Sequence, residues 1–224
     1  MSISDNIQNV RKRVGLAASK SGRGAEEIKI IAVIKNVPLE QVFAALAEGM
    51  TDIGENRIQE AEERYKKIKE KYPKTNFHFI GHLQRNKVRQ SLDMFDIIHS
   101  VDSLRLMQEI DARAMKPVSV LIEVNTSGET SKFGIEFDKA IELAELATSF
   151  KNINVQGLMT MGPLTDDPAI SRDCFRRLKV LKDRIVSAGI ALPYLSMGMS
   201  GDFEVAVEEG SNMVRVGRAI FKGG

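Results

Sequence analysis

The sequence predicts an α/β fold: a closed (β/α)8 barrel of the TIM type with an extra N-terminal helix, formed by residues 1–224 as one domain. Short apolar runs alternate with amphipathic stretches, which indicates parallel strands joined by helical crossovers. Runs such as VSVLIEV (118–124) are nearly continuous in apolar residues, as is typical of strands buried on both faces. Eight such units in about 200 residues fit a small closed barrel. An open doubly wound sheet is the alternative.

The chain opens with a segment of helical periodicity. Its apolar residues recur at spacings of four and three, which places them on one helix face. These residues are Ile3, Ile7, Val10, Val14 and Ala17. Ser4 or Asp5 is expected to cap the start of this helix.

The remaining elements follow in strict alternation. The expected strands are Lys29–Ile34, Thr51–Gly54, Phe77–Ile80, Ile97–Ser100, Val118–Val124, Val155–Met159, Tyr194–Ser196 and Met213–Val216. The expected helices cover about 38–48, 56–71, 84–91, 103–115, 137–149, 168–188 and 202–209. Pro38 suits a first helical turn, and Asp167-Pro168 reads as an N-cap followed by the first helical residue. Gly49 and Gly189 fall where helices should stop.

Composition narrows the class of protein. Hydrophobic residues make up 43% and charged residues 28%, which is ordinary for a globular domain. A net charge of +2 is too small to indicate a nucleic acid or an anionic membrane as partner. Neither a signal peptide nor an apolar run of about 18 residues is present, so a cytoplasmic protein is expected. With no sustained exposed apolar stripe, a monomer is expected.

Metal and disulfide chemistry are not expected. The single cysteine, Cys174, lies within a predicted helix and reads as a packing residue. His78 and His82 are four residues apart, but they span an apolar strand and its exit and have no glutamate between them. No metal site is therefore predicted.

Chemistry in a barrel of this kind belongs at the carboxyl ends of the strands. Lys35 ends the first apolar run, KIIAVIK, so its amine should reach the mouth of the barrel. Partial burial there would lower the pKa of the amine and favour Schiff-base formation. A snorkelling lysine at the rim is the alternative. Polar residues also follow the second, third and fifth strands, where turn formation alone could explain them.

The last two strands carry the strongest pattern. The seventh runs into SMGMSGDF (196–203), and the eighth reads MVRVGRAIF (213–221). Two neighbouring glycine-containing loops can present backbone N–H groups, and Ser200 a hydroxyl, to a phosphate. Asp202 is better placed to cap the next helix. Arg215 facing the barrel interior would need an anion or a ring acceptor; glycine turns with an exposed Arg215 are the alternative.

A Schiff-base lysine, a phosphate-binding loop and an arginine match the three handles of pyridoxal 5′-phosphate (PLP): aldehyde, phosphate and pyridine nitrogen. The residues alone also permit a Schiff-base aldolase that acts on a sugar phosphate.

Six blocks, in order, resemble the YggS/PROSC family, the pyridoxal phosphate homeostasis proteins. They are IAVIKNVP, DIGENRIQE, FHFIGHLQRNK, IEVNTSGETSKFG, GLMTM and SMGMSGDFEVAVEEGSNMVRVGRAIF. The family is similar to the barrel domain of alanine racemase. The resemblance covers residues from about 30 to 221 and implies the barrel fold and PLP as cofactor.

The resemblance also implies roles for single residues. Lys35 would hold PLP as an aldimine, and Arg215 would meet the pyridine nitrogen. Phosphate would contact Ser200 and the backbone near Met199, with help from the loop after the last strand. The other residues implied are Asn56, His82 and Met159 at the pocket wall, and Gly217 and Arg218 in that loop.

Four positions depart from the family pattern. One is Lys222 in the closing IFKGG, where the family usually has glycine directly after the phenylalanine. The family usually has serine before Lys35 and threonine after it, where this chain has Ile34 and Asn36. After VRVG it has threonine or serine, where this chain has Arg218. None of these changes removes Lys35, so PLP binding is still expected.

A binding protein without a catalytic residue is the leading hypothesis. It would hold PLP reversibly, limit free aldehyde and pass the cofactor on, with apo forms of PLP enzymes as recipients. An arginine beside the pyridine nitrogen disfavours ring protonation and so weakens the electron sink. None of the three tyrosines is expected at the mouth as an opposing base. The alternative is a small racemase-like PLP enzyme.

Overall fold

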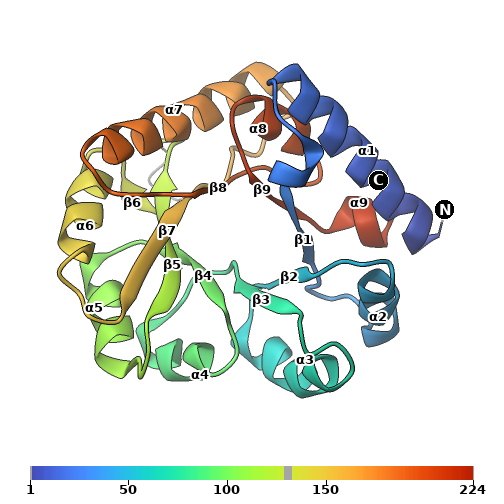
Figure 1. Cartoon of the computed structure of the whole chain (residues 1–224), viewed down its shortest axis with the longest axis horizontal. Helices are drawn as coiled ribbons and strands as arrows, with labels where there is room; N and C mark the ends of the chain where they lie inside the picture. Colours follow the sequence, from blue (N-terminus) through green and yellow to red (C-terminus); the bar gives the residue numbers. More distant parts are fainter. Residues whose placement is uncertain (1, 129–132, 224) are drawn as a thin grey trace.

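The computed structural model describes residues 2–128 and 133–223, and eight of its strands form a closed parallel barrel (Figure 1). The barrel strands are Lys29–Val33 (β1), Asp52–Glu55 (β2), Asn76–Phe79 (β3), Ile97–Val101 (β4), Val118–Asn125 (β5), Ile153–Met159 (β7), Tyr194–Ser196 (β8) and Met213–Val216 (β9). Each pairs with the next, and β9 pairs with β1 to close the ring. The predicted TIM barrel is confirmed, and the open sheet is wrong because of this closing pair.

Helices surround the ring of strands (Figure 1). They are Leu39–Ala47 (α2), Ile58–Lys71 (α3), Val88–Leu92 (α4), Leu104–Arg113 (α5), Lys139–Ala147 (α6), Pro168–Ser187 (α7), Phe203–Glu208 (α8) and Arg218–Phe221 (α9). Predicted and observed bounds differ by a few residues at most, except at 84–91, where a 3-10 turn at Arg85–Lys87 precedes α4. Three short elements were not predicted, because segments of two to four residues carry no periodic signal. They are Ala25–Glu27, Ile135–Glu136 (β6) and α9.

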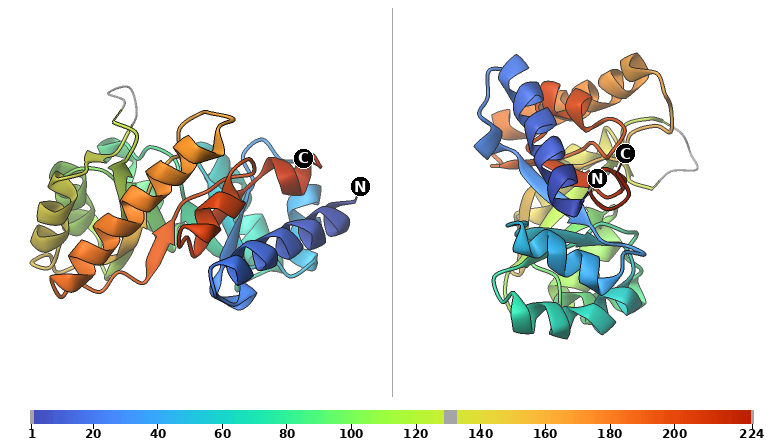
Figure 2. Two further views of the ribbon diagram at one scale, coloured as in Figure 1. Left: turned by 90° about the horizontal axis from the view of Figure 1, so that it is seen from above. Right: turned by 90° about the vertical axis from the view of Figure 1, so that its right-hand side faces the viewer.

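The extra N-terminal helix, Ile3–Lys20 (α1), lies outside the barrel and packs against α2, α8 and α9 (Figure 2). The predicted cap is wrong: Ser2, two residues before Ser4, is the N-cap, and its hydroxyl accepts from the N–H of Asp5. The Asp5 carboxylate accepts in return from the N–H of Ser2, which completes a capping box. The predicted apolar face is buried along its length, from Ile7 onward.

The other predicted helix boundaries agree with the structure in some cases and differ in others. Asp167 and Pro168 are the N-cap and first residue of α7, as predicted, and the Asp167 carboxylate accepts from the N–H of Ala169. Pro38 is the N-cap of α2 rather than a residue of its first turn, since the helix begins at Leu39. Gly49, just past α2, has φ +80°, the left-handed conformation that suits a glycine after a helix.

The apolar core has two parts. The larger lies between the strands and the helices. Cys174 is buried, as a packing residue should be. The smaller is an interior cluster within the barrel, formed by Ile31, Leu121, Met159 and Met213. Polar side chains share the interior with this cluster, and they determine the chemistry of the barrel.

Candidate functional site

The predicted site residues lie in the last half of a strand or in the loop that follows it. Parallel strands bring these ends to one mouth of the barrel. Because β1 pairs with β2 on one side and with β9 on the other, Lys35 stands between the loops that hold Asn56 and Gly217. Residues distant in sequence therefore meet at a single site.

Lys35 lies in a turn beyond β1, which ends at Val33. Its side chain is exposed, so the partial burial expected from the sequence is not found. Asn36 has φ +57°, a left-handed conformation that asparagine tolerates better than most residues. The conformation of this turn explains an asparagine at position 36, where a β-branched threonine would be strained.

Asn56 follows β2 and brings a buried acceptor to the mouth. Its Oδ1 atom has no hydrogen-bond partner among residues 2–128 and 133–223. A buried acceptor of this kind is costly unless something donates to it. Gly81 packs directly against the backbone of Asn56, since a Cβ at position 81 would lie 2.2 Å from the main-chain carbonyl oxygen of Asn56.

The loop after β8 forms a tight turn. Gly198 has φ +94°, and a Cβ there would lie 2.6 Å from the Cβ of Ala206. The N–H of Met199 donates to Asp202 Oδ1 at 2.6 Å, so that N–H is already engaged. Asp202 does occupy the N-cap position of α8, but its carboxylate braces the loop and makes no cap hydrogen bond to the helix. The predicted capping role is wrong in this respect.

Ser200 joins the last two loops. Its hydroxyl accepts from the N–H of Ala219 at 3.3 Å. Gly217 and Arg218 stand directly before Ala219, at the start of α9, and Arg218 is exposed. The loops after β8 and β9 therefore lie side by side, as the sequence predicted.

Arg215 points into the barrel and is 2% exposed, so the alternative of an exposed arginine is wrong. Its Nη1 atom donates to Ser196 Oγ at 2.6 Å, and its Nη2 atom donates to the carbonyl oxygen of Thr160 at 2.9 Å. Burial lowers the pKa of Arg215 to about 10, while the charges of Glu123 and Asp202 act to raise it. The guanidinium thus keeps its charge at neutral pH.

His82 and Met159 have different surroundings. The His82 ring stacks on Phe133 with centroids 4.2 Å apart, and its Nδ1 atom lies 3.6 Å from Asp102 Oδ2. Met159 is buried in the interior cluster, below the loops of the mouth. Residues 129–132 of the fourth quoted block lie outside the described residues.

Glu123 lies in the barrel interior, and no role in the site was predicted for it from the sequence. It lies near the end of β5 and is 5% exposed. Burial and, to a smaller extent, the charge of Asp102 raise the pKa of Glu123 to about 7, against the opposing charge of Arg215. The signal in the sequence was a single acidic residue in an otherwise apolar strand.

The polar residues of the interior do not form a metal site. The described residues contain no group of three or more histidine, cysteine, aspartate or glutamate side chains suited to hold a metal ion. His78 instead contacts His99 and Asp52. Nor is any helix in the described chain long and apolar enough to cross a membrane.

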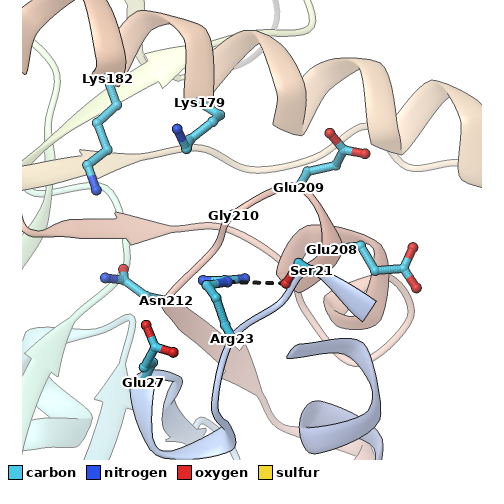
Figure 3. Close-up of a pocket in the computed structure, with 9 residues that line it drawn as sticks. All are labelled: Ser21, Arg23, Glu27, Lys179, Lys182, Glu208, Glu209, Gly210 and Asn212. Atoms are coloured by element: carbon cyan, nitrogen blue, oxygen red, sulfur yellow. Dashed lines mark hydrogen bonds between the residues drawn. The ribbon is translucent and has the colours of Figure 1, made fainter. Parts of the chain in front are cut away.

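A cavity of about 710 Å³ lies away from the mouth, between α7 and the segment that leads into β9 (Figure 3). Lys179 and Lys182 extend into it from α7. Two glutamates on its wall are already paired, since Arg172 bonds both Glu208 and Glu209 at 2.6 Å. The cavity contains no predicted site residue, so the mouth remains the candidate site.

Comparisons with known proteins agree with the fold. The family model "Alanine racemase, N-terminal domain" matches residues 2–223. A "Pyridoxal phosphate homeostasis protein" of Aquifex aeolicus is 40% identical, with 99% of this chain and 98% of the relative covered. A crystal structure of a protein from Bifidobacterium adolescentis has a TM-score of 0.91 at 37% identity and covers 98% of this chain and 94% of that one. PipY of Synechococcus elongatus, solved with PLP bound, has a TM-score of 0.86 at 28% identity, covering 98% of this chain and 100% of PipY.

Proposed function

The chain belongs to the family of the alanine racemase N-terminal domain and to the pyridoxal phosphate homeostasis proteins, and we propose on this basis that it binds PLP reversibly and buffers and delivers it. The observation that carries the proposal is that Lys35, Arg215 and Ser200 lie on or just beyond three adjacent barrel strands, β1, β9 and β8, with the side chain of Arg215 buried. PLP bound in the homologous PipY structure supports it.

The residues present fit the cofactor. The unpartnered Oδ1 atom of Asn56 can accept a hydrogen bond from a ligand at the mouth. Arg215 is charged, buried and bonded only to neutral atoms of Ser196, Thr160 and Met161 within the described chain. Both features are what a site for a polar, anionic ring compound requires.

Each residue has a distinct task in this proposal. When bound, PLP supplies an aldehyde that condenses reversibly with a primary amine. Lys35 offers that amine on an exposed turn, where cofactor can enter and leave. Ser200 and the backbone of Gly217 and Arg218 hold the phosphate, and Arg215 keeps a positive charge beside the pyridine nitrogen. His82 and Met159 complete the wall and floor of the site.

In this proposal the backbone N–H of Met199 does not bind the phosphate, although the sequence suggested that it would. Its N–H is bonded to Asp202, so the peptide that follows it is the better phosphate donor. The role of Met199 is then to shape the loop, with Gly198 fixing the turn before it.

A carrier is favoured over an enzyme by the positions of the tyrosines. Tyr65 stacks edge-on against Phe77 at 4.9 Å, and Tyr72 ends α3. Tyr194 begins β8, at the amino end of the barrel, where it lines a second cavity. None of the three is at the mouth to serve as a base opposite Lys35, so the racemase-like alternative lacks a tyrosine for that role.

The proposal extends to partners and location. The chain acts as one PLP-binding domain and as a monomer, in the cytoplasm, with apo forms of PLP enzymes as recipients. Exposure of Lys35 supports delivery, because a recipient can reach the linkage without unfolding of the barrel.

Titration with PLP tests the proposal. The protein should develop a visible absorption band, and borohydride should fix a pyridoxyl mass on the peptide that contains Lys35. Lys35→Ala should abolish the band, while Lys151→Ala, at another exposed lysine, should leave it unchanged. Absence of a band in the wild type, or an adduct on another lysine only, would refute the proposal.

Two further assays separate carrier from enzyme. Activation of an apo PLP enzyme by the loaded protein supports delivery. Exchange of the α-proton of an amino acid in D2O by the wild type, but not by Lys35→Ala, would favour the racemase-like alternative.

A further inference from the structure

A continuous chain of hydrogen bonds crosses the barrel interior and ends on Arg215. Ser196 Oγ lies 2.6 Å from Arg215 Nη1 and 3.0 Å from His99 Nδ1. His78 Nδ1 lies 2.9 Å from His99 Nε2, and its Nε2 atom lies 2.9 Å from Asp52 Oδ1. We call this set the polar relay; its members are Arg215, Ser196, His99, His78 and Asp52.

The polar relay links strands that are not neighbours. Asp52, His78 and His99 lie on β2, β3 and β4, which pair in that order. Ser196 lies on β8, which pairs with β7 and β9 and not with β4. The bond from His99 to Ser196 therefore crosses the lumen. All five members are at most 3% exposed, so the bonds are shielded from water.

With both histidines neutral, the carboxylate end fixes the direction of every bond. A guanidinium can only donate, and a carboxylate can only accept. A neutral histidine has one donor and one acceptor nitrogen, and a hydroxyl can do both. Because Asp52 can only accept, His78 donates to it from Nε2, and the Nδ1 atom of a neutral His78 accepts from His99 Nε2. The Nδ1 atom of a neutral His99 then accepts from Ser196, whose hydroxyl also accepts from Arg215.

The charged groups at the two ends of the polar relay are consistent with these hydrogen-bond directions. Burial alone would raise the pKa of Asp52, but hydrogen bonds from His78, Thr51 and Lys29 lower it below its usual range. Asn76 also donates to Asp52 Oδ1, at 3.2 Å. At the other end, Glu123 and Asp202 are the carboxylates whose charges act on Arg215.

His99, at the middle of the polar relay, is neutral. Burial lowers the pKa of His99 well below its ordinary value, and the charge of Arg215 lowers it further. A neutral His99 has a single proton, and that proton lies on Nε2 when His78 Nδ1 is the acceptor.

We propose that the polar relay is a positioning device, in which the other four members hold the guanidinium of Arg215 in one orientation at the mouth. The functional half of this proposal rests on the proposed PLP binding. An arginine side chain loses considerable rotational freedom when it is fixed, and a site whose charge is already in place does not incur that cost on binding. Asp52 and the two histidines are thus positioning residues that never touch the ligand.

The first experiment reads the histidine tautomers of the PLP-free wild type by ¹⁵N NMR. His99 is expected to be neutral and protonated on Nε2 from about pH 6 to pH 8, and His78 is expected to carry a proton on Nε2. His82, outside the polar relay, serves as the internal reference. A proton on His99 Nδ1 would reverse the bond to Ser196 and overturn the proposal.

The second experiment breaks the polar relay at Ser196→Ala and follows the Nη protons of Arg215, again without PLP. Their separate signals in the wild type should merge in the variant, because the guanidinium can then rotate. Ser91→Ala is the control, since Ser91 is a buried serine whose hydroxyl bonds Val88 O at 2.7 Å, outside the polar relay. Unchanged Arg215 signals in Ser196→Ala would overturn the proposal.

PLP affinity completes the test. Ser196→Ala should bind PLP roughly tenfold more weakly, the effect of a lost hydrogen bond to a charged group; Ser91→Ala should bind within about twofold of wild type. Equal affinity in Ser196→Ala would overturn the functional half. Failure of the wild type to bind PLP would refute the proposed function alone, because both NMR experiments are made without the cofactor. If Ser196→Ala does not fold, the wild-type tautomers still decide the direction of the bonds.

Discussion

Replacing Glu123 with glutamine should change how the stability of the barrel depends on pH. The pKa of Glu123 is raised from 4.5 to about 7 by burial. Between those pH values the folded protein keeps a proton that the unfolded chain has lost. Unfolding then releases a proton, so the free energy of unfolding falls as pH rises through this window.

The size of the effect follows from the pKa. One pKa unit corresponds to about 1.4 kcal/mol, so the wild type should lose about 3 kcal/mol at this site between pH 4.5 and pH 8. Glu123→Gln cannot titrate and should not lose it. Glu55, whose pKa burial also raises to about 7, contributes equally to both proteins and cancels from the comparison.

Urea unfolding at several pH values measures this difference. The stability of Glu123→Gln relative to wild type should rise by about 2.5 kcal/mol between pH 5 and pH 8. Glu136→Gln is the control, since the side chain of Glu136 is 75% exposed. Curves for Glu123→Gln and wild type that stay parallel within about 0.5 kcal/mol would refute the reasoning.

Three further predictions concern the backbone. Asn36→Thr should lower the free energy of unfolding by about 1 kcal/mol, because Asn36 has φ +57°. Asn36→Gly should change that free energy by less than about 0.5 kcal/mol. A larger loss for glycine than for threonine in urea unfolding would contradict this. Gly198→Ala should lower the free energy of unfolding by about 2 kcal/mol or more, since its Cβ would lie 2.6 Å from the Cβ of Ala206. A thermal midpoint unchanged from that of the wild type would count against this prediction. Ser2→Ala should cost about 1 kcal/mol through loss of the capping box, as chemical denaturation can measure, with Ser4→Ala as the neutral comparison.

The fold was largely predictable from the sequence because burial imposes a local pattern. VSVLIEV is mostly apolar because β5 is covered on both sides, and α1 repeats its apolar residues at helical spacing because one face packs on the barrel. The errors at Ser2 and Pro38 concern helix ends, where the signals of adjacent residues compete. β6 has two residues, too few to show a period.

The sequence also predicted where chemistry should lie. A lysine after the first strand and glycine loops after the last two are local features, and parallel strands bring their ends together. It could not tell that the Met199 N–H is used by Asp202, because that bond depends on the geometry of the turn. Nor could it tell that Lys35 is exposed.

By itself, then, the sequence determined the barrel, its strand order and the residues at its mouth, since each follows from periodicity and from the end of a strand. Only the tertiary structure decided the state of the interior. Asp52, His78, His99 and Ser196 are separated by up to 144 positions, and no spacing relates them until the barrel closes. Closure places them in line with Arg215, and burial then determines which of them carries charge.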